Sequence, residues 1–432
     1  MRDYLLQQVR CLDPVSGQDA VLDIWVAAGR IEAMAPQLSP PSGVTVIPAA
    51  GRILGPGLVD LYSHSSEPGY ESRETIASLL AAAQGGGFTR IHLLPDMAPP
   101  LDRPAGLADW PRRLGHECPI QVGFWGALTQ NLAGEQMAEL ADLRQAGVVG
   151  FTDGRPLPHL GLVRRLLEYV KPWGIPVALW PWESRLAGVG VAREGAIALA
   201  LGLPEVPAST ETAALAALLE VIASVDTAVH LLRISTARSV ELLRQARNSG
   251  VPVTASTPWF HLLLSTTDLG SLHPHLRVTP PLGTPEDREA LIAGITAGWV
   301  DAVAVDHTPY TYEEKTVPFG VAPSGMVGYG LVLPLLWERL VTPGSWEART
   351  LWKALSTRPA ACLGQAPPQL IPGSRAEWVL FDPDLPWDVT PQTLCSQAIN
   401  TPWLHQSCRG RVVALSSIDG SYRSLEQPGA SC

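Results

Sequence analysis

The 432-residue chain lacks several features that mark particular classes of protein. It has no run of Lys or Arg, and its formal net charge of −10 argues against nucleic acid or an anionic membrane as a partner. No uncharged apolar stretch reaches the ~18 residues of a membrane span. The N-terminus lacks the basic start and apolar core of a signal peptide. We therefore expect a cytoplasmic protein.

Cysteine is scarce, and its placement excludes two common uses. None of the six cysteines has the C-x-x-C spacing of a zinc ribbon, and a chain of this length does not need a disulfide framework. The pattern predicts reduced thiols. The six positions are Cys11, Cys118, Cys362, Cys395, Cys408 and Cys432.

Apolar residues are plentiful, at 46% of the chain against 17% charged, which predicts a globular protein with a large core. The length exceeds what one core usually serves, because domains typically run to about 100–200 residues and α/β barrels to about 250. Gly and Pro are frequent but spread throughout, as expected for many tight connections. A barrel with a smaller second domain suits this length.

Both ends of the chain read as short β-strands. The stretch VLDIWVAAGRIEAMAP contains two alternating runs around Ala28-Gly29, which is typical of a hairpin. EWVLFDPD and GRVVALSSIDG near the C-terminus have similar character. We expect residues 1–54 and 370–432 to form one small β-sandwich domain, with residues 55–369 as a separate barrel.

The middle of the chain alternates apolar strands with helical segments such as GLVRRLLEYVKPWG and STARSVELLRQARNSG. Continuous apolar strands separated by helices indicate a parallel sheet that is covered on both faces. Eight such units favour an α/β fold of the (β/α)8 TIM-barrel class. A doubly wound open sheet is the alternative, but no Gly-x-Gly-x-x-Gly follows the first strand. The predicted strands span residues 57–62, 90–95, 120–126, 148–153, 176–182, 228–235, 251–257 and 301–307.

Polar and aromatic side chains gather where these strands end. In a barrel the chemistry sits at the C-terminal face of the strands, so these residues should share one mouth. They are Asp60, Tyr62, His64, Asp96, Thr152, Asp153, Trp180, Trp182, Arg233, Ser235, Asp306 and His307.

The ordered motifs along the chain resemble those of a known family. They include GLVDL with His64, EPGYESRETI (67–76), LPDMAPPLD (94–102), GFTDGRP (150–156), TPPLGTPEDREALIAG (279–294) and DAVAVDHTPYTYEEK (301–315). The chain resembles dihydroorotases of the amidohydrolase superfamily from end to end. The resemblance implies a barrel beside a small β domain, and a place in pyrimidine biosynthesis.

Active members of that family carry a binuclear zinc site, and the resemblance implies where its parts fall here. The metal-ligand positions are Tyr62, His64, Asp153, Trp180 and Arg233, and Asp306 stands at the catalytic aspartate. The substrate-pocket positions are Ser66, Asp96, Thr279, His307 and Tyr310. Three of the four family histidines are thus replaced, by Tyr62, Trp180 and Arg233. Ser66 and Asp96 replace the family's contacts to the substrate carboxylate.

These replacements predict that the zinc site is lost. Only His64, Asp153 and Asp306 remain to hold a metal, and the positive charge of Arg233 opposes a divalent ion. We expect no cofactor, with zinc only if the site works in an altered form. A buried unpaired carboxylate is costly, so our hypothesis is an ion pair from Arg233 to Asp306 or Asp153. The alternative is that Arg233 points into solvent.

The other histidines and the tryptophans have simpler interpretations. His92 lies inside a strand and is expected in the core, and His273 and His275 are expected at the surface. Trp180, Trp182 and Trp259 are expected to fill the space left by metal and ligand. An aromatic-lined pocket for another small molecule is the alternative.

Three functions follow from these observations. The first is a non-catalytic dihydroorotase-like protein, a structural or regulatory partner, by resemblance of aspartate transcarbamoylase, and a homo-oligomer. The second is a working dihydroorotase or related cyclic-amide hydrolase, which converts N-carbamoyl-L-aspartate to dihydroorotate with an altered metal site. The third is a small-molecule binding protein that uses the tryptophan-rich mouth.

Overall fold

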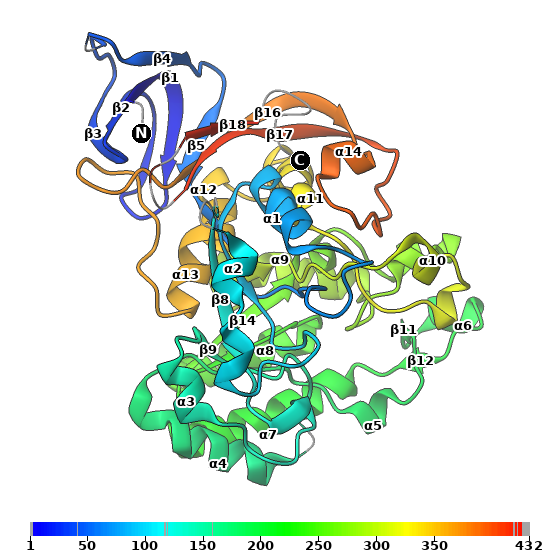
Figure 1. Ribbon diagram of the computed structural model, residues 1–432. Helices are drawn as coiled ribbons and strands as arrows, with labels where there is room; N and C mark the ends of the chain where they lie inside the picture. The colour runs from blue at the N-terminus through cyan, green and yellow to red at the C-terminus, as the bar shows by residue number, and fades with distance from the viewer. Residues whose placement is uncertain are drawn as a thin grey trace.

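The protein is described here from a computed structural model that covers residues 3–40, 42–115, 118, 120–157, 159–417, 420 and 422–425. Figure 1 shows two parts: a barrel surrounded by helices, and a β domain whose single sheet combines strands from both ends of the chain. Cys432 lies outside the described residues.

Eight parallel strands form the barrel, and each corresponds to a predicted strand. They pair in two groups of four, β6-β7-β8-β9 and β10-β13-β14-β15. Backbone hydrogen bonds join the groups, from Phe151 N to Pro176 O at 2.9 Å and from His64 N to His307 O at 2.9 Å. The predicted fold class is therefore confirmed. The strands are β6 (Leu58–Val59), β7 (Phe88–Leu93), β8 (Gln121–Gly126), β9 (Gly150–Phe151), β10 (Ala178–Leu179), β13 (Val229–Leu231), β14 (Val253–Pro258) and β15 (Ala302–Ala304).

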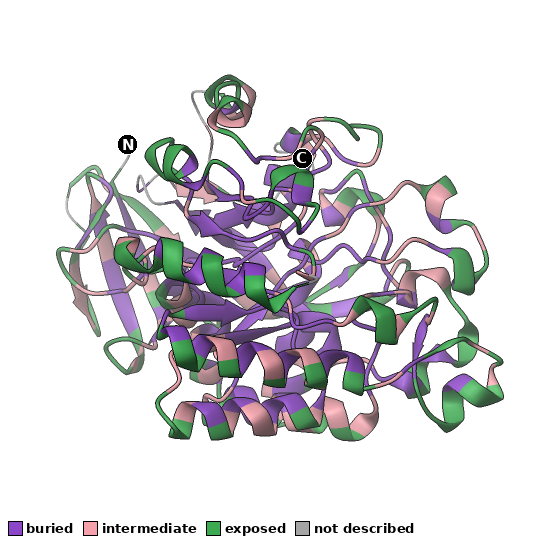
Figure 2. Cartoon of the chain, turned by 90° about the horizontal axis from the view of Figure 1, so that it is seen from below, coloured by how far each residue is buried: buried purple, intermediate pink, exposed green. Residues whose placement is uncertain are grey.

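Amphipathic helices cover the barrel, with buried faces toward the strands and exposed faces outward (Figure 2). The long ones are α1 (Ile76–Gly85), α4 (Leu160–Val170), α7 (Ser209–Val225), α8 (Ala237–Asn248) and α9 (Pro285–Ala297), whereas α11 (Tyr329–Leu336) has no exposed face. Shorter helices are α2 (Trp110–Leu114), α3 (Leu140–Gln145), α5 (Ser184–Ala187), α6 (Ala196–Ala200), α10 (Tyr312–Lys315), α12 (Ala348–Trp352), α13 (Arg358–Cys362) and α14 (Pro391–Leu394). A two-stranded ribbon, β11 (Ala192–Arg193) and β12 (Glu205–Val206), lies between α5 and α7 in the chain.

The β domain is one eight-stranded sheet in the order β18-β17-β16-β5-β1-β2-β3, with β4 also paired to β1. The predicted hairpin is confirmed by the antiparallel pair β2 and β3, which turns at Ala28 and Gly29. Leu6, Ile24 and Trp378 belong to a small core separate from that of the barrel. Its strands are β1 (Tyr4–Asp13), β2 (Gln18–Ala27), β3 (Arg30–Ala35), β4 (Thr45–Pro48), β5 (Ile53–Pro56), β16 (Trp378–Asp388), β17 (Ser407–Ser416) and β18 (Tyr422–Ser424).

A buried ion pair fastens the β domain to the barrel. Arg90 on β7 donates to Glu377 through Nε at 2.8 Å and Nη2 at 2.6 Å. Thr89 Oγ1 donates to the same carboxylate at 2.7 Å. Because Glu377 directly precedes β16, this contact fixes the C-terminal strands against the first half of the barrel.

A capping box starts helix α9, within the TPPLGTPEDREALIAG motif. Thr284 Oγ1 accepts from Asp287 N at 3.2 Å, and Asp287 Oδ2 accepts from Thr284 N at 2.9 Å. We expect Thr284→Ala to lower the apparent free energy of unfolding by about 1 kcal/mol, the usual cost of losing such a cap. Urea unfolding followed by circular dichroism measures it. Thr296→Ala, on an exposed position of the same helix, is the control and should not destabilise.

Four thiols, Cys11, Cys118, Cys362 and Cys408, are free, as predicted. Cys395 is disulfide-bonded, so the expectation of reduced thiols throughout is wrong for this residue. Within the described ranges, no helix is long and apolar enough to cross a bilayer.

Candidate functional site

The mouth of the barrel is organised around a buried ion pair between Arg233 and Asp306. Arg233 donates to both carboxylate oxygens, from Nε at 2.9 Å and from Nη2 at 2.7 Å, and both side chains are buried. The two residues follow β13 and β15 in the left-handed backbone region, with φ of 56° and 48°. Such conformations cost free energy outside glycine and tend to mark functional positions. The hypothesis that Arg233 pairs with a carboxylate is confirmed, and the partner is Asp306.

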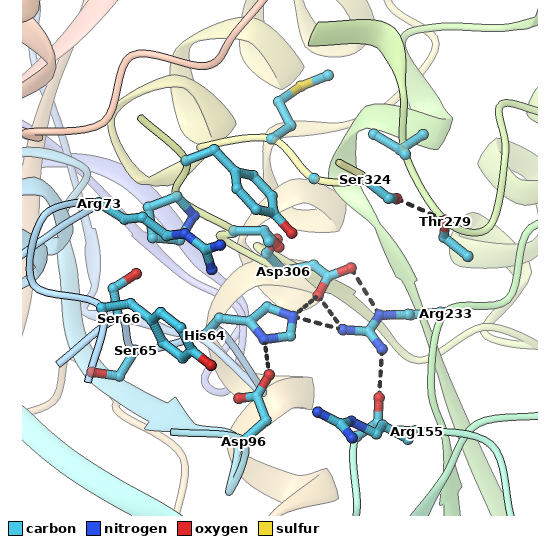
Figure 3. Close-up of a pocket in the computed structure, with 18 of the residues that line it drawn as sticks. His64, Ser65, Ser66, Arg73, Asp96, Arg155, Arg233, Thr279, Asp306 and Ser324 are labelled. Carbon is cyan, nitrogen blue, oxygen red and sulfur yellow. Dashed lines mark hydrogen bonds and ion pairs between the residues drawn. The ribbon is translucent and has the colours of Figure 1, made fainter. Parts of the chain in front are cut away.

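The rest of the Arg233 guanidinium is also held. Nη1 donates to the carbonyl oxygen of Gly154 at 2.8 Å (Figure 3). The guanidinium carbon lies 4.7 Å from the centroid of the Trp180 ring and 5.5 Å from that of Tyr62. Trp180 and Tyr62 therefore form aromatic surfaces for the Arg233 cation.

His64 lies between Asp96 and Arg233. Its Nδ1 is 2.6 Å from Asp96 Oδ2, and its Nε2 is 3.0 Å from Arg233 Nη2 (Figure 3). Burial lowers the pKa of His64, whereas the carboxylates of Asp96 and Asp306 raise it. The 3.0 Å contact with Arg233 Nη2 requires an unprotonated Nε2, because two donors cannot share a hydrogen bond. In this geometry the ring is neutral, donates from Nδ1 to Asp96 and accepts at Nε2 from Arg233.

Asp153 is held by the loop that follows β8 rather than by the ion pair. It accepts from Leu128 N at 2.8 Å, from Thr129 N at 3.0 Å and from Thr129 Oγ1 at 2.5 Å. Burial raises the pKa of Asp153, and these donors oppose the increase. Its hydrogen bonds are thus those of a structural carboxylate that fixes a loop.

The residues at the mouth do not fit a binuclear zinc centre. Zinc needs three or four nitrogen, oxygen or sulfur ligands around one point. His64 Nε2 and Asp306 Oδ1 are 3.7 Å apart, and Arg233 Nη2 contacts both of them. Among the residues that the structure describes, no group of three or more His, Cys, Asp or Glu side chains could hold a metal ion. The guanidinium takes the place where a cation would have to bind.

An open cavity of about 260 Å³ lies above the ion pair. Of the predicted pocket residues, Ser66, Asp96, Thr279 and Tyr310 line it, as do His64, Trp180, Arg233 and Asp306. Tyr62 and Asp153 are buried and do not line the cavity. The expectation that the tryptophans fill the vacated space is only partly met, because Trp180 stacks on Arg233 and the cavity stays open.

His307 does not line the cavity, contrary to the prediction. Its Nε2 donates to Glu74 Oε2 at 2.8 Å, and its Nδ1 accepts from Gly328 N at 3.2 Å. Glu74 also accepts from Ser78 Oγ and Ser396 Oγ. The backbone after β15 turns the imidazole into this buried network, away from the mouth.

Two arginines at the cavity were missed by the sequence analysis. Arg73 lies between the rings of Tyr70 and Tyr310, 4.7 Å from each centroid, and pairs with Glu314. Arg155 is exposed and lines the cavity beside Gly154. A signal for Arg155 was present, since it follows Asp153 at the end of a predicted strand. Arg73 lies in a long loop, where the sequence gives no direction for a side chain.

The remaining histidines behave largely as expected. His92 is buried, with Nδ1 2.6 Å from Asp60 O and Nε2 2.9 Å from Gln365 Nε2, so it is a core residue. His273 is exposed, whereas His275 is partly buried and contacts Thr401 O at 2.8 Å. Trp259 is fully buried beside Trp403 and does not line the cavity.

The family description "Dihydro-orotase-like" matches residues 51–157, from just before β5 through the loop after β9. A "Probable dihydroorotase-like protein" of Synechocystis sp. is 43% identical over 95% of this chain and 98% of its own length. The chain belongs to the dihydroorotase-like family. A protein named "Dihydroorotase" from Pelobacter propionicus is 36% identical over 95% of this chain and 97% of its own.

Solved structures extend the comparison of this dihydroorotase-like chain to its whole fold. An L-hydantoinase (dihydropyrimidinase) from Arthrobacter aurescens superposes with a TM-score of 0.84, at 22% identity, over 98% of this chain and 96% of its own. A D-hydantoinase from Thermus sp. gives 0.81 at 19% identity, over 98% and 97%. At these identities the likeness concerns the fold.

Proposed function

We propose that this dihydroorotase-like protein has lost hydrolytic activity and serves as a structural or regulatory protein of pyrimidine metabolism. One observation carries the proposal: Arg233 Nη2 contacts both His64 and Asp306, the two mouth residues best placed to hold a metal. Hydrolysis of a cyclic amide at neutral pH needs an activated water, which a bound zinc supplies by lowering the water's pKa toward ~7. A fixed guanidinium has no open coordination position for that water.

The ion pair also removes the catalytic aspartate from proton transfer. Burial would raise the pKa of Asp306, but the Arg233 guanidinium outweighs it and lowers the pKa well below the ordinary range. A carboxylate that accepts two hydrogen bonds from one guanidinium is a poor base, since protonation would break the pair. This supports a structural role for Asp306.

The proposed partner is aspartate transcarbamoylase, and the proposed location is the cytoplasm. A preserved barrel with an altered mouth suits a protein that acts through its surface. We also propose that the chain forms a homo-oligomer. Affinity purification of the tagged chain from cell extract, followed by mass spectrometry, tests the partner. Recovery of the transcarbamoylase in amounts near those of the chain supports it, and absence of any pyrimidine enzyme contradicts it.

The loss of activity is tested on the purified chain. We expect well below about 0.1 zinc per chain after dialysis, by inductively coupled plasma mass spectrometry, because the ligand set is incomplete. We also expect no turnover of dihydroorotate or N-carbamoyl-L-aspartate above the rate without enzyme. The matched control is an active dihydroorotase purified in the same way. About two zinc per chain, or zinc-dependent turnover, would overturn the proposal in favour of a working hydrolase with an altered metal site.

A further inference from the structure

The cavity above the ion pair holds two charged groups that lack a partner for part of their hydrogen-bonding capacity. Asp96 accepts one hydrogen bond among the described residues, from His64 to Oδ2, so Oδ1 is unused. Arg155 takes part in no ion pair or hydrogen bond recorded within the described part of the chain. By contrast, Arg233 pairs with Asp306, and Arg73 pairs with Glu314.

Arg155 and Asp96 line the same cavity without touching. Both are drawn beside one space in Figure 3, and no dashed line joins them. Asp96 accepts a hydrogen bond from His64 at 2.6 Å and lies within electrostatic reach of Arg233 and Arg155. A cation and an anion that face one open space leave room for a molecule that carries both charges.

We propose that this cavity binds a small α-amino acid, whose carboxylate pairs with Arg155 and whose ammonium group pairs with Asp96. Its two charged groups are joined by one carbon, so a single molecule can contact both side chains. Guanidinium and carboxylate form charge-assisted hydrogen bonds with such groups. The inference rests on the proposed function, since it treats the mouth as a binding site in which nothing is hydrolysed.

The size and walls of the cavity agree with this ligand. With a volume of about 260 Å³, the cavity has room for a small amino acid. Trp180 and Phe260 supply apolar wall, and Ser65 and Ser66 supply hydroxyls. An inorganic anion would satisfy Arg155 but leave Asp96 facing a like charge. A zwitterion is thus favoured over an anion alone.

Ligand-observed NMR and calorimetry on the full chain test the proposal. The probes are L-alanine, L-serine and L-aspartate, each compared with its N-acetyl derivative, which lacks the ammonium group, and its amide, which lacks the α-carboxylate. We expect at least one amino acid to bind with a millimolar or lower Kd, and both of its derivatives to bind at least about tenfold more weakly. Binding of no amino acid, equal binding of a derivative, or equal binding of inorganic phosphate would overturn the proposal.

Two substitutions locate the site. Arg155→Met and Asp96→Asn should each weaken binding at least about tenfold, whereas Arg165→Met, an exposed arginine on α4, should leave it unchanged. Asparagine can still accept from His64, so Asp96→Asn should keep its fold, which circular dichroism checks. Unchanged binding in both variants would contradict the assignment. Zinc content and turnover of the same preparation report separately on the proposed function.

Discussion

Arg233→Met should lower the apparent free energy of unfolding by about 3–5 kcal/mol, because it leaves a buried carboxylate without its cation. Arg233 supplies two hydrogen bonds to Asp306 and one to Gly154 O, and its side chain is buried. Methionine keeps much of the volume and the contact with Trp180 but offers no donor. Urea unfolding followed by circular dichroism measures the loss.

The double variant Arg233→Met/Asp306→Asn separates charge from packing. Because asparagine carries no charge and tolerates a positive φ, the double variant should be about 1–2 kcal/mol more stable than Arg233→Met alone. Arg165→Met serves as the surface control and should change stability by less than about 0.5 kcal/mol. A loss below about 1 kcal/mol for Arg233→Met would mean that another group compensates Asp306.

The ion pair between Arg233 and Asp306 also predicts how the stability of the fold changes at acid pH. Arg233 lowers the pKa of Asp306 below its unfolded value of about 4. Its stabilisation is therefore fully present above pH ~4 and is lost as the pH falls further. Arg233→Met should flatten this part of the stability curve, and unfolding between pH ~2 and pH ~5 measures the difference.

Tyr62→His combined with Arg233→His should give the barrel mouth a zinc site, with about one zinc retained per chain after dialysis. The double substitution removes the guanidinium and adds two imidazoles beside His64 and Asp306, which together make four ligands of the type zinc prefers. Arg233 lies over Tyr62, whose hydroxyl is 3.2 Å from Arg233 N, so the two positions are adjacent. Plasma mass spectrometry measures the metal.

Two further variants test whether the Arg233 charge is what excludes zinc and whether Asp306 is a ligand. Tyr62→His alone should bind no zinc, because the positive charge of Arg233 remains between His64 and Asp306. Adding Asp306→Asn to the double variant should remove the metal again. Zinc in the Tyr62→His protein would show that Arg233 is no obstacle. Turnover should stay absent in all of these variants, since Ser66 and Asp96 leave the substrate carboxylate without the family's contacts.

Much of the fold could be predicted from the sequence, because its signals are local. Alternating and continuous apolar runs gave the eight barrel strands, and the caps and glycines around them gave the main helices. The positions of the strand ends also predicted where the site residues lie, because parallel strands bring their carboxyl ends to one face of the barrel. Tyr62, His64, Arg233 and Asp306 do meet at the mouth.

The directions of the side chains could not be predicted in the same way. His307 follows Asp306 directly in the chain, yet one side chain enters the ion pair and the other a buried network with Glu74. Asp153 was an equal candidate for Arg233, and the loop after β8 supplies the three hydrogen bonds that hold it elsewhere. These outcomes depend on donors that are distant in the chain.

By itself, the sequence determined the barrel, the β2–β3 hairpin of the β domain, and the presence of Tyr62, Trp180 and Arg233 at the ends of barrel strands. Only the tertiary structure decided what these side chains do together. Arg233 and Asp306 are 73 residues apart, and their pairing across the mouth depends on closure of the barrel and on two residues with positive φ. The cavity that remains, with Arg155 and Asp96 facing it, follows from the same closure, because the loops of different strands form its walls.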